Sequence, residues 1–180
     1  YGGFPEDPAD GMTRDDLRQG DMPWQMQDEN GTSNETILEG YGYNGDCTWS
    51  GSNNSWTPTS ESCHVVWFAP LDEGEGEFGL RTELCGVTIR GGYASGQSGT
   101  DGMGGGVYMQ GERTALVNCV VKENRAQNHG GGVYLKGGRV EGCLIYNNSA
   151  VTGHGGAVYA DTRGEVLRCM VANNSGRNGG

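Results

Sequence analysis

The fold is decided by a stretch that reads Gly130-Gly131-Gly132-Val133-Tyr134-Leu135, because similar stretches occur on either side of it. The other two copies run over 104–109 and 155–160, so the Val-Tyr pair recurs after 26 and then 25 positions. A second block follows each copy, beginning with Cys and ending with Asn five positions later, over 119–124, 143–148 and 169–174. Two blocks that recur in phase at one period predict a repeat architecture.

The contents of the period indicate strands. The regular pieces are short, rich in Val, Ile and Tyr, and bounded by Gly and Asn. No window has the i, i+3, i+4, i+7 apolar spacing of a helix. A unit of about 25 residues without a helix cannot bury its own apolar face, but stacked copies can pair strand on strand in parallel. The sequence therefore predicts an all-β fold, a parallel β-helix (solenoid) with about 25 residues per coil.

Alternation along each strand predicts which side chains point inward. Val and the residue two positions later should face the core, as should the Cys and the residue two positions after it, while Tyr108, Tyr134 and Tyr159 point outward. Like residues would then form columns, and Cys85, Cys119, Cys143 and Cys169 are expected to share one of them. Asn124, Asn148 and Asn174 end the second strand, where stacked amides can hydrogen-bond along the coil axis.

These motifs resemble those of a known family. Gly155-Gly156-Ala157-Val158 is similar to the GGA[I/L/V] motif of the polymorphic outer membrane protein repeat, and its companion FxxN has counterparts in Val121-x-x-Asn124, Ile145-x-x-Asn148 and Val171-x-x-Asn174. The wider pattern resembles exported bacterial proteins of the pectin-lyase-like superfamily. The resemblance implies a right-handed β-helix and an extracellular or bacterial outer-membrane surface location. It covers about residues 85–180 well, and it indicates fold rather than activity.

Length and composition predict one domain over residues 1–180. Residues 1–83 are expected to form irregular, acidic, loop-rich coils, with strands at 35–40 and 64–68 and a long loop over 41–63; residues 84–180 form the regular coils. Glycine is abundant, with 35 residues, but has no triplet period, which excludes collagen. We expect the chain to be a fragment of a longer polypeptide, whose remainder or a partner covers the open coil ends.

Charge excludes some partners. Residues 1–80 contain 16 Asp and Glu against 2 Arg, a balance of −14, whereas residues 81–180 contain 7 against 10 Lys and Arg, a balance of +3. An acidic half repels nucleic acid, so no nucleic-acid partner is expected. No run of 18 apolar residues occurs, so no transmembrane segment is expected either.

The six cysteines divide into two groups. The four in the repeats are expected to be reduced, because parallel Cβ vectors on adjacent rungs suit the disulfide dihedral badly. Cys47 and Cys63 lie outside the repeats and bracket a Gly, Ser, Asn, Thr and Trp-rich loop, so a disulfide between them is a possible staple in an oxidising, exported setting. The short paired spacings of a zinc site do not occur, and no metal or other cofactor is expected.

Catalysis is not expected within these residues. Enzymes on this fold place several carboxylates on one outer sheet, but the outward positions beside the tyrosines hold Gln110, Lys136 and Asp161. His129 and His154 recur in phase, and exposed turn histidines are the favoured interpretation, because no third metal ligand recurs beside them.

The tyrosines are the patterned surface. Tyr108, Tyr134 and Tyr159 are candidate residues for stacking on sugar rings, and they can equally stack on one another. Trp49, Trp56, Trp67, Tyr41 and Tyr43 form a second aromatic group. We predict a non-catalytic structural or adhesive module that binds a glycan or a protein. The alternative is part of a polysaccharide lyase or glycoside hydrolase whose catalytic residues lie outside this segment.

Overall fold

The computed structural model describes residues 36–40, 46–50, 55–59, 64–69 and 82–180. In these ranges the chain is all β, with one short 3-10 segment at Gly99–Gly102 and no α-helix. The described part contains no helical segment with the length and apolar character needed to cross a bilayer.

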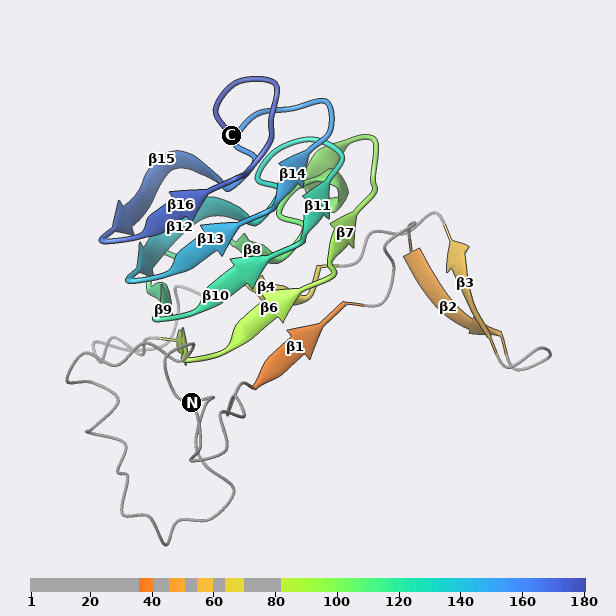
Figure 1. Cartoon of the computed structure of the whole chain (residues 1–180), viewed down its shortest axis with the longest axis horizontal. Helices are drawn as coiled ribbons and strands as arrows, with labels where there is room; N and C mark the ends of the chain where they lie inside the picture. Colours follow the sequence, from red (N-terminus) through yellow and green to blue (C-terminus); the bar gives the residue numbers. More distant parts are fainter. Residues whose placement is uncertain (1–35, 41–45, 51–54, 60–63, 70–81) are drawn as a thin grey trace, which may run out of the picture.

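One sheet consists of five parallel strands that lie side by side and point the same way (Figure 1). In spatial order they are β1 (Ile37–Glu39), β6 (Thr88–Arg90), β10 (Val120–Lys122), β13 (Leu144–Tyr146) and β16 (Met170–Ala172). Val121 pairs with Ile89 on one side and with Ile145 on the other. Equivalent positions of successive repeats are therefore direct neighbours, as the period predicts.

A second parallel sheet contains the glycine-preceded strands. Its members are β4 (Val66–Phe68), β8 (Val107–Met109), β12 (Val133–Glu141), β15 (Val158–Leu167), β9 (Thr114–Val117) and β5 (Thr82–Cys85). The first residues of β12 pair with β8 and its last residues with β9, and the register against β15 shifts between Leu135 and Gly137. This irregularity divides the sheet into two faces, the first with β4 and β8 and the second with β9 and β5.

A third, smaller parallel sheet joins β7 (Tyr93–Ala94), β11 (Arg125–Ala126) and β14 (Ser149–Ala150). The three sheets lie around a common interior, and consecutive turns of the chain lie one above the next (Figure 1). The predicted all-β class with parallel sheets is confirmed.

The expected loop over 41–63 is wrong where the structure describes it. There β2 (Asp46–Ser50) and β3 (Ser55–Thr59) form an antiparallel hairpin in which Trp49 pairs with Trp56. The hairpin projects away from the parallel sheets (Figure 1). Thr48-Trp49-Ser50 and Ser55-Trp56-Thr57 mirror one another in the sequence around a Gly, Ser and Asn stretch, a pattern that is typical of such a hairpin.

The core consists of columns of like residues, as the alternation predicts. Val107 and Val133 are fully buried, and so are Met109 and Leu135, which follow them by two positions. Val121 and Ile145 form the corresponding column in the five-stranded sheet. In the last described coil the same positions are more open: Val171 is 47% exposed and Ala160 is also exposed.

Each turn of the chain bends where the backbone has positive φ. One bend precedes the cysteine strand, at Gly86, Asn118, Gly142 and Arg168. A second precedes the asparagine position, at Gly91, Glu123, Asn147 and Asn173. The third is the first glycine of each repeated block, with φ near +67° at Gly104 and Gly130. Only glycine adopts this conformation without cost, so the non-glycine bends require support from the surrounding hydrogen bonds.

The expectation that Cys85 belongs to the cysteine column is wrong. Cys85 pairs with Val117, and the residue on the level of Cys119 is Val87, as shown by the pairing of Thr88 with Val120. Cys85 thus ends β5, one bend earlier than the other thiols. The error arises because residues 85–87 and 119–121 both have the pattern Cys-x-Val. A shift of two residues keeps the same side chains pointing inward, so alternation alone does not reveal it.

The predicted asparagine column is confirmed, and its hydrogen bonds are continuous over four levels. Asn148 Oδ1 accepts from the backbone N–H of Asn124 at 3.0 Å, and Asn174 Oδ1 accepts from that of Asn148 at 2.9 Å. The Asn124 Oδ1 likewise accepts from the Gly92 N–H at 2.9 Å. Asn124 and Asn148 are each 1% exposed, so these amides are buried and their polar atoms are satisfied by the neighbouring levels.

Candidate functional site

The tyrosines predicted to form an outward column do so, and the column has a fourth member. Trp67 pairs with Tyr108, Tyr108 with Tyr134, and Tyr134 with Tyr159. The three tyrosine rings are stacked, with centroids 5.1 and 5.4 Å apart and planes within 10° of parallel. Trp67 meets Tyr108 edge-on, at 6.3 Å and 86°. We call these four residues the aromatic column.

Exposure differs strongly along the aromatic column. Tyr108 is 2% exposed and Tyr134 is 8% exposed, whereas Trp67 is 61% exposed. Burial, with the charges of Asp161 and the neighbouring tyrosines, raises the pKa of Tyr134. The stacked tyrosines contact one another and leave little surface to a ligand, while the indole of Trp67 is open. Whether any of them contacts a sugar stays a prediction.

Sequence reasoning placed Trp67 in another aromatic group and missed its place here. The available signal was Val66-Trp67-Phe68, which matches Val107-Tyr108-Met109 in having an aromatic residue between two inward apolar residues. The preceding glycines, which mark the other copies, are absent before Val66. Trp49 and Trp56 lie on the hairpin, and Tyr41 and Tyr43 lie outside the described residues.

Two histidines line one side of the aromatic column. The His129 and His154 rings are stacked at 5.3 Å, and His129 lies 4.6 Å from the Tyr159 ring. The backbone N–H of His154 donates to His129 Nδ1 at 3.1 Å, which requires that nitrogen to be unprotonated. Burial and the adjacent His154 lower the pKa of His129, in agreement with a neutral ring. Among the described residues no group of three or more His, Cys, Asp or Glu side chains is arranged to hold a metal ion.

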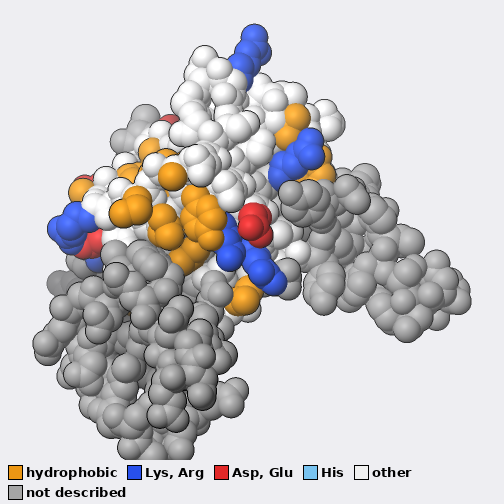
Figure 2. Space-filling model, viewed as in Figure 1, with side chains coloured by type: hydrophobic (Ala, Val, Ile, Leu, Met, Phe, Trp, Pro, Cys, Tyr) orange, Lys and Arg blue, Asp and Glu red, His pale blue; other side chains and the backbone are white. Residues whose placement is uncertain are grey.

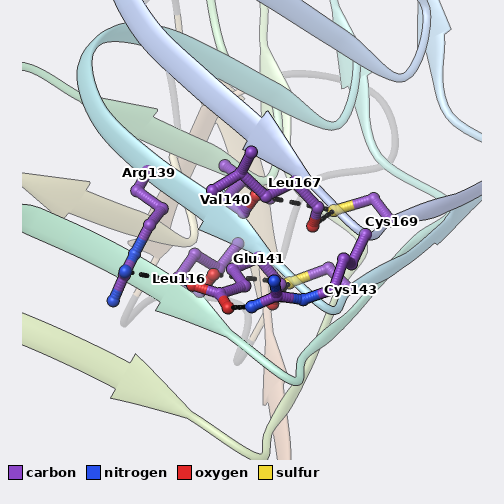
Figure 3. Close-up of polar contacts among 8 residues, drawn as sticks. Leu116, Arg139, Val140, Glu141, Cys143, Leu167 and Cys169 are labelled. Atoms are coloured by element: carbon purple, nitrogen blue, oxygen red, sulfur yellow. Dashed lines mark hydrogen bonds and ion pairs between the residues drawn. The ribbon is translucent and has the colours of Figure 1, made fainter.

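The thiols of Cys119, Cys143 and Cys169 form a column on consecutive levels, and none of these three is in a disulfide. Each of the three donates to the backbone carbonyl two residues before it, at 3.2 to 3.3 Å. Figure 3 shows the Cys143 and Cys169 sulfurs directed at carbonyl groups of the neighbouring level. Hydrogen bonding to the thiols on either side, together with burial, raises the pKa of Cys143.

Cys169 is the thiol of this column that we expect to react. Its hydrogen bond from Cys143 lowers its pKa to about 6, although partial burial acts in the opposite direction. The thiolate should therefore predominate above that pH, and alkylation by iodoacetamide should accelerate as the pH rises through it. Peptide mass spectrometry should find Cys169 modified at pH 7.5 while Cys119 and Cys143 stay unmodified until urea is added. Equal labelling of Cys143 and Cys169 in the folded protein would contradict the geometry.

The possible Cys47–Cys63 disulfide falls outside the described residues. Cys63 is not among them, and Cys47 is described by its backbone pairing with Pro58. This pairing stays a prediction.

A polar pocket lies on the second face of the glycine-strand sheet, beyond the register shift of β12. It has a volume of about 360 Å³, and its lining includes the small residues Ala115 and Gly138. Six charged residues surround it: Glu83, Glu112, Arg113, Arg139, Arg163 and Glu165. We call it the Arg/Glu pocket. Four of its lining residues share one column of paired positions, Glu83, Ala115, Arg139 and Glu165. Sequence reasoning missed the pocket because these residues belong to strand segments that the repeated blocks do not mark.

The charges of the Arg/Glu pocket are paired in part. Arg163 forms an ion pair with Glu112, and Arg139 Nη1 lies 3.1 Å from Glu141 Oε2. Glu141, which does not line the pocket, lies beside Arg139 (Figure 3) and also forms an ion pair with Arg168. In the described part of the chain, Glu83, Arg113 and Glu165 form no ion pair.

The outer face of the five-stranded sheet carries side chains of several kinds. Figure 2 shows hydrophobic side chains gathered over β10 and β13, with basic side chains and an acidic one next to them. Lys122 and Tyr146 pair across these strands and alternate with inward Val121 and Ile145. This face is a mixed surface of the kind that many soluble domains present.

Comparisons of the chain with protein-family models, with curated proteins and with solved structures find no match.

Proposed function

We propose that this chain is a segment of a right-handed parallel β-helix from an exported bacterial protein of the pectin-lyase-like superfamily. We propose further that it serves as a non-catalytic structural or adhesive module at the cell surface or outside the cell. The aromatic column, with the open indole of Trp67 at one end, is the surface that we assign to a glycan.

The observation that supports the structural role is the continuous asparagine column. Each buried amide satisfies the level above and the level below, so a local opening breaks hydrogen bonds on several levels at once. Every described sheet apart from the hairpin is parallel and pairs residues far apart in sequence. Such a scaffold resists local unfolding, which is the property required of a rigid module that displays loops and aromatic side chains.

Support for a glycan contact comes from the exposure of Trp67. An exposed indole over a stacked aromatic row presents a flat apolar face with a polar edge, which suits the apolar face of a sugar ring. The described outward positions near it include Gln110, whose side-chain amide donates to the Tyr108 hydroxyl at 3.3 Å. Amides at such places can hydrogen-bond sugar hydroxyls.

We expect Trp67→Ala to weaken retention on immobilised glycans by about tenfold, the effect of losing one aromatic contact of 1–1.5 kcal/mol. The measurement is retention on a panel of neutral and acidic polysaccharides. Tyr134→Ala is the companion variant, and it should weaken retention too if the column acts as a unit, but at a cost in stability because the ring is buried. Retention by Trp67→Ala equal to that of the parent chain would remove the aromatic column from consideration.

A further inference from the structure

The Arg/Glu pocket has features of a binding site that the aromatic column does not explain. Its lining includes two small residues, Ala115 and Gly138, and charged residues from several consecutive levels of the chain. Leu116, the next residue of β9, is fully buried in the core. Because side chains alternate along a strand, the Ala115 side chain points to the opposite face, toward the pocket. The volume of about 360 Å³ lies within the range of sites that hold small ligands or a few side chains.

The charge balance of the Arg/Glu pocket defines its ligand. Its lining contains three guanidinium and three carboxylate groups, so a ligand of one sign would gain from half of them and be repelled by the other half. Arg113, Glu83 and Glu165 have no ion-pair partner in the described ranges. The two glutamates lie at opposite ends of one column, with Ala115 and Arg139 between them. A ligand with both an anionic and a cationic group can satisfy both kinds of free charge.

The lining also decides between a glycan and a peptide. It contains no aromatic ring for stacking on a sugar and no Asn or Gln amide for its hydroxyls. Guanidinium groups bind carboxylates in a bidentate manner, and carboxylates bind ammonium and guanidinium groups. Acidic and basic side chains within a few residues of one another are the ordinary source of such a pair of charges. Those features favour a peptide.

We propose that the Arg/Glu pocket binds a short peptide segment in which acidic and basic side chains alternate. Arg113 binds the acidic side chain of the peptide, and Glu83 and Glu165 bind the basic ones. The small side chain of Ala115 leaves space for them. The proposal does not rest on the proposed glycan contact, because the pocket shares no residue with the aromatic column.

The test is fluorescence anisotropy with the whole chain and a labelled, end-blocked peptide of alternating Glu and Lys. All-Glu, all-Lys and Gly-Ser peptides of equal length are the comparison probes, and an acidic oligosaccharide is a competitor. We expect the alternating peptide to bind most tightly, and raised salt to weaken the binding, since the pocket is open to solvent. Equal binding of all peptides, or displacement by the oligosaccharide at lower concentration than by unlabelled peptide, would overturn the proposal.

Three variants locate the binding. Arg113→Gln should weaken it about five- to tenfold by removing one charge-assisted contact. Ala115→Leu should weaken peptide binding because the larger side chain fills part of the pocket without changing any charge. Lys122→Gln removes a cation on the five-stranded sheet, outside the pocket, and should leave binding within about twofold of the parent chain, as a charge on another sheet screened by salt should. Unchanged binding by both Arg113→Gln and Ala115→Leu would show that the peptide binds elsewhere and would refute the assignment.

Discussion

Asn148→Ala is expected to lower the free energy of unfolding by about 3 kcal/mol, because it leaves several buried polar groups without partners. The Asn148 amide accepts from the backbone N–H and the side chain of Asn124, both at 3.0 Å. It also donates to the Val121 carbonyl at 2.9 Å. Since Asn148 is 1% exposed, water cannot replace these bonds without opening the coil. Urea denaturation followed by tryptophan fluorescence or circular dichroism measures the loss.

Asn147→Gly is the matched control for this prediction. Asn147 is the neighbouring residue, is exposed, and has φ of +56°, which glycine adopts without strain. We expect this variant to stay within about 0.5 kcal/mol of the parent chain, as exposed substitutions usually do. If Asn147→Gly and Asn148→Ala destabilised the protein equally, the cost would come from the bend and not from the amide column.

The parallel strands and their core columns were predictable because the repeated blocks specify them residue by residue. Strand alternation alone makes Val133 and Leu135 face inward and Tyr134 outward. The constant spacing of the blocks then predicts that equivalent residues of successive repeats pair with one another. Asparagine at the strand end predicted the hydrogen-bonded column in the same way. The prediction fails where the residues of the repeat change. Cys85 was assigned to a level that Val87 occupies, because aligning either residue with Cys119 keeps the same alternation of inward side chains.

The site was less predictable for a physical reason. The Arg/Glu pocket is formed by strands that follow the register shift in β12, where two levels are out of step by one residue. Glu112 and Arg163 are 51 positions apart and carry no repeated signature, yet the shift places them in contact. In the aromatic column, spacing predicted that three rings would stack, but burial depends on neighbouring side chains. The low exposure of Tyr108 and the high exposure of Trp67 could therefore not be read from period or composition.

Gly131→Ala is expected to destabilise the protein by about 3 kcal/mol or more, because the stacked levels leave no room for a methyl group. A Cβ at Gly131 would lie 2.4 Å from the Gly156 carbonyl oxygen and 2.4 Å from the Ser149 carbonyl carbon. Both are backbone atoms, so relief requires a shift of the strands themselves. The middle glycine of the repeated block thus sets how closely one turn approaches the next, whereas the first glycine, Gly130, sets the bend with its positive φ.

Gly137→Ala supplies the comparison that makes this prediction specific to stacking. The three atoms nearest to its Cβ would belong to Glu112, at 3.4 to 3.5 Å, which is an ordinary van der Waals distance, and Gly137 is not among the glycines with positive φ. The added methyl should leave stability unchanged or raise it by about 0.5 kcal/mol, through lower entropy of the unfolded chain. Thermal and urea unfolding of the two variants side by side tests the point. If neither alanine variant is destabilised, the close contact between levels at Gly131 does not exist in solution. If only Gly131→Ala is destabilised, the close approach of consecutive levels is what requires glycine at that position.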